Sequence, residues 1–150
     1  MKDLNQLKTT IKELFDNQRL AVLSTNNKGQ PYSNLVAFSA SEDLKTLVFA
    51  TTRSTRKYSN LAAESRVSLL IDNRSNQISD FFQAIGITAT GTATELKGEE
   101  KDVLLKHHLD KHKTLKDFVQ SPSCALLKIT VEVYYLVTRF QNVQELHIKP

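Results

Sequence analysis

A strand-like segment leads into a basic helix start in the stretch Phe49-Ala50-Thr51-Thr52-Arg53-Ser54-Thr55-Arg56-Lys57-Tyr58-Ser59-Asn60-Leu61. Ser54 is a good N-cap residue, which predicts that Arg56 and Lys57 lie in the first helical turn. Positive charge is unfavourable there, because the helix dipole and the free N–H groups favour anions. A phosphate that accepts hydrogen bonds from these N–H groups and from the cationic side chains would explain the arrangement. The alternative interpretation is a solvated basic turn.

Hydrophobic patterns on both sides of this stretch predict the other elements. Apolar residues at helical spacing predict a helix over residues 3–16, and further helices are predicted at 55–64, 99–113 and 115–119. Strands are predicted at residues 19–25, 30–40, 46–51, 66–72, 85–96, 124–138 and 143–148. Six or seven strands that mostly follow one another, with three or four helices, predict a mainly β fold, an antiparallel barrel with peripheral helices.

Composition places the chain among ordinary globular proteins. Its 150 residues are 40% hydrophobic and 24% charged, which predicts one domain over residues 1–150. Cys124 is the single cysteine, so no intramolecular disulfide forms and a reducing compartment is expected. Because the first residues resemble no secretory signal and no apolar run reaches membrane-spanning length, we expect a cytoplasmic protein that does not associate with a membrane.

The order of elements around the basic stretch resembles that of the pyridoxamine 5'-phosphate oxidase-like flavoproteins, the FMN-binding split barrels. In that family a strand ending in Thr leads to a Ser/Thr-Arg-Lys triplet at a helix start, and a further barrel strand follows, here residues 66–71. The resemblance covers nearly the whole chain in element order and is most specific over residues 49–71. It implies a split barrel, FMN as the cofactor, and a homodimer with two cofactor sites at its interface.

The resemblance also implies the residues that contact FMN. Arg56 and Lys57 match the ligands of its phosphate, with help from Arg53 and Ser54, and residues 29–38 match the strand whose backbone lies along the flavin ring. Residues 72–76 form a polar turn in the simplest interpretation; by the resemblance, this turn touches the cofactor or substrate at the barrel rim. The implied set is Asn34, Leu35, Val36, Ala37, Thr51, Thr52, Arg53, Ser54, Arg56, Lys57, Asn73 and Arg74.

The chain departs from the oxidase that names the family. That enzyme has an Arg and a Lys on the early flavin-contacting strand, whereas the corresponding places in this chain, near Leu35 and Ala40, are apolar or small. The C-terminal Arg-x-His motif of that enzyme is also absent from this chain. We therefore expect an FMN-dependent oxidoreductase of unknown small-molecule substrate, with no catalytic residue that the sequence identifies. The alternative is a non-catalytic flavin or haem carrier, or a redox sensor, since residues 134–140 resemble the C-terminal part of haem-utilisation relatives.

Other candidate sites carry weaker signals. His108 and His112 share a helix face that is compatible with a metal or haem, but Lys residues beside them favour a solvated basic face, and no metal site is expected. Cys124 is expected to be buried and unreactive. A nucleic-acid-binding barrel is disfavoured, because the net charge is only +4 and the four Tyr and seven Phe fall mostly in apolar runs.

Overall fold

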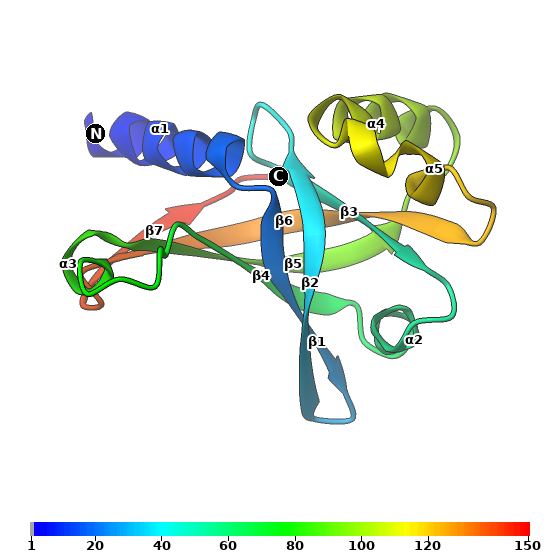
Figure 1. Cartoon of the computed structure of the whole chain (residues 1–150), viewed down its shortest axis with the longest axis horizontal. Coiled ribbons are helices and arrows are strands. Elements are labelled where there is room, and N and C mark those ends of the chain that lie inside the picture. The colour runs from blue at the N-terminus through cyan, green and yellow to red at the C-terminus, as the bar shows by residue number, and fades with distance from the viewer. Residues whose placement is uncertain (1) are drawn as a thin grey trace.

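A closed antiparallel barrel of six strands, with one strand outside it, forms the centre of the molecule (Figure 1). The computed structural model describes residues 2–150, with side chains from Leu4 onward. Neighbouring strands follow the order β3-β2-β1-β4-β5-β6-β7, and pairing of β3 with β6 closes the barrel. The strands are β1 (Leu20–Asn27), β2 (Gln30–Ala40), β3 (Thr46–Thr52), β4 (Arg66–Asp72), β5 (Ile85–Glu95), β6 (Cys124–Thr138) and β7 (Asn142–His147).

Helices surround this barrel. They are α1 (Lys2–Asn17), α2 (Arg56–Ala63), α3 (Asp80–Gln83), α4 (Gly98–Lys111) and α5 (Lys116–Val119), with a short 3-10 turn, η1 (Lys113–Leu115), before α5. In Figure 1, α4 and α5 lie together at the upper right and α3 lies at the far left. Over residues 2–150, no helix combines the length and the apolar character required to cross a bilayer. The predicted mainly β antiparallel barrel is confirmed.

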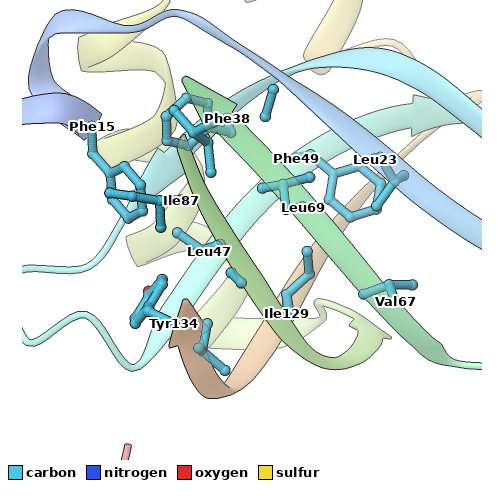
Figure 2. Packing of buried hydrophobic residues seen from close by; sticks show 14 of the residues in the cluster. Phe15, Leu23, Phe38, Leu47, Phe49, Val67, Leu69, Ile87, Ile129 and Tyr134 are labelled. Carbon is cyan, nitrogen blue, oxygen red and sulfur yellow. The ribbon is translucent and has the colours of Figure 1, made fainter. Parts of the chain in front are cut away.

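The barrel interior is filled by alternate residues of its strands, as a period of two requires. β1, for example, buries every second residue from Ala21 to Thr25. The apolar face of α1 completes this core, and Phe15 packs edge-on against Phe38 with ring centroids 5.4 Å apart. Phe15 also packs against Tyr134, with ring centroids 5.7 Å apart (Figure 2). The buried hydroxyl of Tyr134 donates to the carbonyl oxygen of Leu44 at 2.7 Å.

Two local predictions need correction. The predicted strands 19–25 and 30–40 leave residues 26–29 for the turn between them. The observed turn is shorter, because β1 continues to Asn27 and only Lys28 and Gly29 form the hairpin turn. Both turn residues have positive φ, 52° and 87°, which matches the twist of the flanking strands in a two-residue turn. The short helix α3 was not predicted, since four residues are too few to show a helical period.

The histidines of α4 attach this helix to β2. His107 Nε2 donates to the carbonyl oxygen of Ala40 at 2.8 Å, and His112 Nε2 donates to that of Phe38 at 2.7 Å. β1 pairs with β2 only as far as Ala37 of β2. Past that residue, the two imidazoles donate hydrogen bonds to carbonyl oxygens of β2. His108 is 0% exposed and His112 is 5% exposed. The predicted solvated basic face is therefore wrong for these two residues: each is buried, with one imidazole nitrogen paired to β2, His108 through the Ser39 hydroxyl and His112 through the Phe38 carbonyl oxygen.

One glycine of β5 is required by a close backbone approach. The register between β5 and β6 shifts between Thr90 and Gly91, and a Cβ on Gly91 would lie 2.2 Å from the backbone oxygen of Thr130. The replacement Gly91→Ala is expected to lower the free energy of unfolding by about 1–3 kcal/mol, since the backbone of β6 must move to accept the methyl group. Chemical denaturation of the purified variant measures this loss.

Gly86, on the same strand, provides the matched control. A Cβ there would meet only Leu70 Cδ1, at 3.9 Å, which is ordinary van der Waals contact. Gly86→Ala should therefore leave the stability unchanged or raise it slightly, since alanine lowers the conformational entropy of the unfolded chain. Equal losses in the two variants would contradict the steric argument for Gly91.

Candidate functional site

The start of α2 presents the basic residues in the first helical turn, as predicted. Thr55, and not Ser54, is the N-cap: its Oγ1 accepts a hydrogen bond from the backbone N–H of Tyr58 at 3.3 Å. The same Oγ1 lies 2.8 Å from Thr51 Oγ1, which ties the helix start to the end of β3. Ser54 is one residue too early and is exposed. The helix therefore begins at Arg56, and no acidic residue occupies its first turn.

A cleft of about 380 Å³ lies beside this helix start. It is bounded by β2, the end of β3, the first turn of α2 and residues of the α4–α5 region. Six residues of the predicted cofactor set line it together: Leu35, Val36, Ala37, Thr51, Thr52 and Lys57. The remaining lining residues are Leu20, Ala50, Thr55, His108, Leu115, Phe118 and Val119. Elements from three separate parts of the chain thus converge on one small-molecule-sized cavity.

Lys57 is the cation of this cleft. Burial lowers the pKa of its ammonium group, because the charged form loses part of its hydration. Among the side chains of residues 4–150, no carboxylate lies close enough to form an ion pair with it. A partly desolvated cation next to the unpaired N–H groups of a helix start is a site that favours an anion.

Arg56 lies outside the cleft lining but next to it along the chain. Its side chain is exposed, and its guanidinium lies over the ring of Tyr32 on β2 at 5.7 Å from the centroid. Among the described residues, no carboxylate pairs with this guanidinium either. Arg56 therefore has donors available for an anion at the start of α2.

Arg53 has structural partners instead. Its guanidinium donates to Glu95 Oε2 at 2.6 Å and to the carbonyl oxygens of Pro122 and Cys124 at 3.0 and 3.2 Å. The other oxygen of Glu95 accepts from the hydroxyl of Tyr58 at 2.8 Å. Arg53 thus joins the β3–α2 turn to β5 and to the start of β6, and it does not line the cleft.

Three further predicted residues lie apart from the cleft. Asn34 precedes Leu35 on β2, so its side chain is on the opposite face of the strand, where its Oδ1 is buried without a hydrogen-bond partner. Asn73 Oδ1 accepts from the backbone N–H of Ile85 at 2.7 Å, and Arg74 pairs with Asp72 at 3.0 Å. Arg74 lines a separate cavity of about 640 Å³ near α3, which shares no lining residue with the cleft.

Several other residues line the cleft that sequence reasoning did not place there. His108, Leu115, Phe118 and Val119 come from the α4–α5 region, far along the chain from β2 and β3. Their local pattern is that of ordinary helical residues. Only the packing of this region on the outer face of the barrel brings them to the cleft, through a cluster that includes Val48 and Leu126.

A comparison with protein families assigns the chain to a family. The family model described as pyridoxamine 5'-phosphate oxidase matches residues 7–138 of the chain. The chain belongs to the pyridoxamine 5'-phosphate oxidase family. The predicted family is therefore confirmed, and the match includes the whole barrel up to the end of β6. No curated protein matches the chain at a significant level.

Solved structures share the fold at low sequence identity. A heme binding protein from Mycobacterium smegmatis aligns with a TM-score of 0.77 and 18% identity, over 87% of this chain and 53% of that one. General Stress Protein 26 from Bacillus anthracis aligns with a TM-score of 0.71 and 24% identity, over 95% and 98% of the two chains. A FAD-binding protein from Mesorhizobium loti aligns with a TM-score of 0.70 and 17% identity, over 85% and 90%. The chain thus spans about half the length of the mycobacterial protein.

Proposed function

We propose that this chain binds FMN in the cleft between β2, β3, α2 and the α4–α5 region. The observation that carries the proposal is Lys57, a partly buried cation at a helix start that lines the cleft, with no carboxylate partner among the side chains of residues 4–150. A phosphate there would restore the interactions that burial removes from the ammonium group. The family and the FAD-binding neighbour support a flavin as the bearer of that phosphate.

The other residues of the cleft fit such a ligand. Lys57, Arg56 and the N–H groups of the first turn of α2 would hold the phosphate, with the hydroxyls of Thr51 and Thr52 nearby. Leu35 and Ala37 on β2 supply an apolar wall for the ring. Arg53 is left out of this set, since Glu95 already pairs with it.

Bound FMN would supply electron transfer, while the protein supplies binding and orientation. Apart from Lys57 and His108, the cleft lining holds no ionisable side chain. We therefore propose an oxidoreductase whose chemistry lies in the cofactor, acting on a small molecule that the structure does not identify. A non-catalytic flavin or haem carrier of the same fold is the second candidate, because one structural neighbour is a heme binding protein.

We also propose that the cleft is completed in a homodimer. Large apolar side chains stand exposed on its rim: Leu20 is 52% exposed, Leu35 is 61% and Phe118 is 43%. A contiguous exposed apolar rim is characteristic of a surface that another protein covers. A cytoplasmic location is part of the same proposal, in line with the single buried Cys124.

A comparison of FMN with riboflavin tests the phosphate site directly. The two ligands share the same ring and differ in the phosphate, so FMN is expected to bind the purified protein at least about 10²-fold more tightly, since charge-assisted hydrogen bonds each contribute roughly 1.5–3 kcal/mol. Quenching of flavin fluorescence during titration measures both dissociation constants. Equal affinities would exclude the assignment of the phosphate to α2. Haem is titrated in parallel, and a Soret band that FMN does not suppress would favour the haem carrier.

A further inference from the structure

His108 has a nitrogen that no protein group satisfies. Its Nδ1 lies 2.8 Å from Ser39 Oγ, whereas its Nε2 is buried and has no hydrogen-bond partner among residues 4–150. The side chain as a whole is 0% exposed and still forms part of the cleft lining. An unsatisfied polar atom in such a position calls for an explanation, because buried polar groups are nearly always paired.

Attachment of α4 to β2 does not explain why Nε2 of His108 lacks a partner, as the neighbouring histidines show. His107 and His112 each donate Nε2 to a carbonyl oxygen of β2, and neither lines the cleft. His108 contacts β2 through the Ser39 hydroxyl, and its second nitrogen has no partner among residues 4–150. Leu35, Ala37 and Ser39 lie on the same face of β2. Leu35, Ala37 and His108 line the cleft, and Ser39 contacts His108 from behind this lining.

Counting hydrogen-bond donors and acceptors indicates which imidazole nitrogen of His108 carries the proton. The side chain of Ser39 is buried, and the only hydrogen-bond partner of its hydroxyl among residues 4–150 is His108 Nδ1. If the hydroxyl donates to Nδ1, only one hydrogen remains unpaired, that on Nε2. If instead Nδ1 donates, the hydroxyl hydrogen is left buried without an acceptor and Nε2 also lacks a donor. The first arrangement leaves fewer unsatisfied atoms, which makes Nε2 a hydrogen-bond donor.

We propose that His108 Nε2–H donates a hydrogen bond to an acceptor atom of the flavin ring and so orients the ring in the cleft. This inference rests on the proposed function, since it assumes that the flavin occupies the cleft. The acceptors of the right kind are the carbonyl oxygens and unprotonated ring nitrogens of the isoalloxazine. His108 is a ligand-orienting residue in this arrangement, and Ser39 holds its tautomer.

The variant His108→Asn separates the two nitrogens. An asparagine Oδ1 can accept from Ser39 much as Nδ1 does, while no atom replaces Nε2. We expect FMN to bind this variant roughly tenfold more weakly than the wild type, with a shifted visible spectrum of the bound flavin. His107→Asn is the matched control: the same substitution on the same helix, outside the cleft, should change neither quantity.

A measurement on the unmodified protein keeps the test independent of folding. In the wild type with ¹⁵N-labelled histidine, addition of FMN should shift the Nε2 resonance of His108 and leave that of His107 in place. If FMN does not bind the wild type, the proposed function itself fails. If FMN binds, but the Nε2 resonance stays unchanged and His108→Asn retains full affinity and the same spectrum, a buried water is the partner of His108 and this inference is overturned.

Discussion

Replacing Arg56 and Lys57 together by alanine is expected to weaken FMN binding by roughly 10²–10⁴-fold. Each side chain offers charge-assisted hydrogen bonds to the phosphate, and a loss of about 1.5–3 kcal/mol for each residue gives this range. The pair is treated as a unit because the two residues serve the same anion, so the single replacements need not add up to the double one. Fluorescence titration with FMN measures the effect.

The double variant should remain folded. Alanine is the best helix former, and the change removes two cations from the unfavourable end of α2. The contact that is lost, between Arg56 and Tyr32, is on the surface and contributes only about 0.5–1 kcal/mol. Riboflavin, which has no phosphate, should bind the variant as well as it binds the wild type.

A matched control removes the same charge elsewhere. Lys8 and Lys12 are exposed on α1, so Lys8→Ala with Lys12→Ala lowers the net charge equally without touching the cleft. If this control loses as much FMN affinity as the Arg56 and Lys57 variant, the loss comes from the overall electrostatic field of the protein. Full retention of FMN by the Arg56 and Lys57 variant would refute the phosphate site.

Acidification is expected to destabilise the fold through the histidines of α4. Burial, reinforced by the nearby His112 and Lys111, lowers the pKa of His108 from 6.5 to about 3. Between these values the unfolded chain binds a proton that the folded chain does not, so the free energy of unfolding falls as the pH falls. At 1.36 kcal/mol per pH unit, His108 alone contributes a loss of roughly 3 kcal/mol between pH 7.5 and pH 4. Burial also lowers the pKa of His112, which adds to this loss.

Urea denaturation at a series of pH values measures this dependence. Carboxylates titrate in part of the same range, so the informative quantity is the difference in slope between the wild type and a variant. His108→Asn should flatten the curve below pH 6.5 relative to that of the wild type. A wild-type slope in His108→Asn would show that His108 is protonated in the folded protein at acid pH.

Much of the fold follows from local patterns. The strands Gln30–Ala40, Arg66–Asp72 and Cys124–Thr138 have the predicted bounds, because their apolar and β-branched residues alternate or run continuously between turn residues. The hairpin turn was predicted two residues too long, since Asn26 and Asn27 have turn propensity but continue the strand pairing of β1 with β2. Pairing with a neighbouring strand overrode the local preference there.

The candidate site was predictable only in part. The cationic helix start could be read from the sequence, because the effect of charge at a helix end depends on residues a few positions apart. Arg53 has the same charge and lies in the same turn, yet Glu95 of β5 takes its guanidinium. No local rule distinguishes it from Arg56 and Lys57, since the carboxylate that decides is 42 residues away in the chain.

The sequence by itself thus determined the strands, the family and the basic start of α2, all of which depend on short-range spacing. Tertiary structure decided which of those cations are free for a ligand and which histidine reaches the cleft. His108 is buried beside Ser39, 69 residues away in the chain, because α4 packs across the end of β2. Burial and hydrogen bonding of this kind arise from contacts between distant segments, and these form only once the barrel has closed.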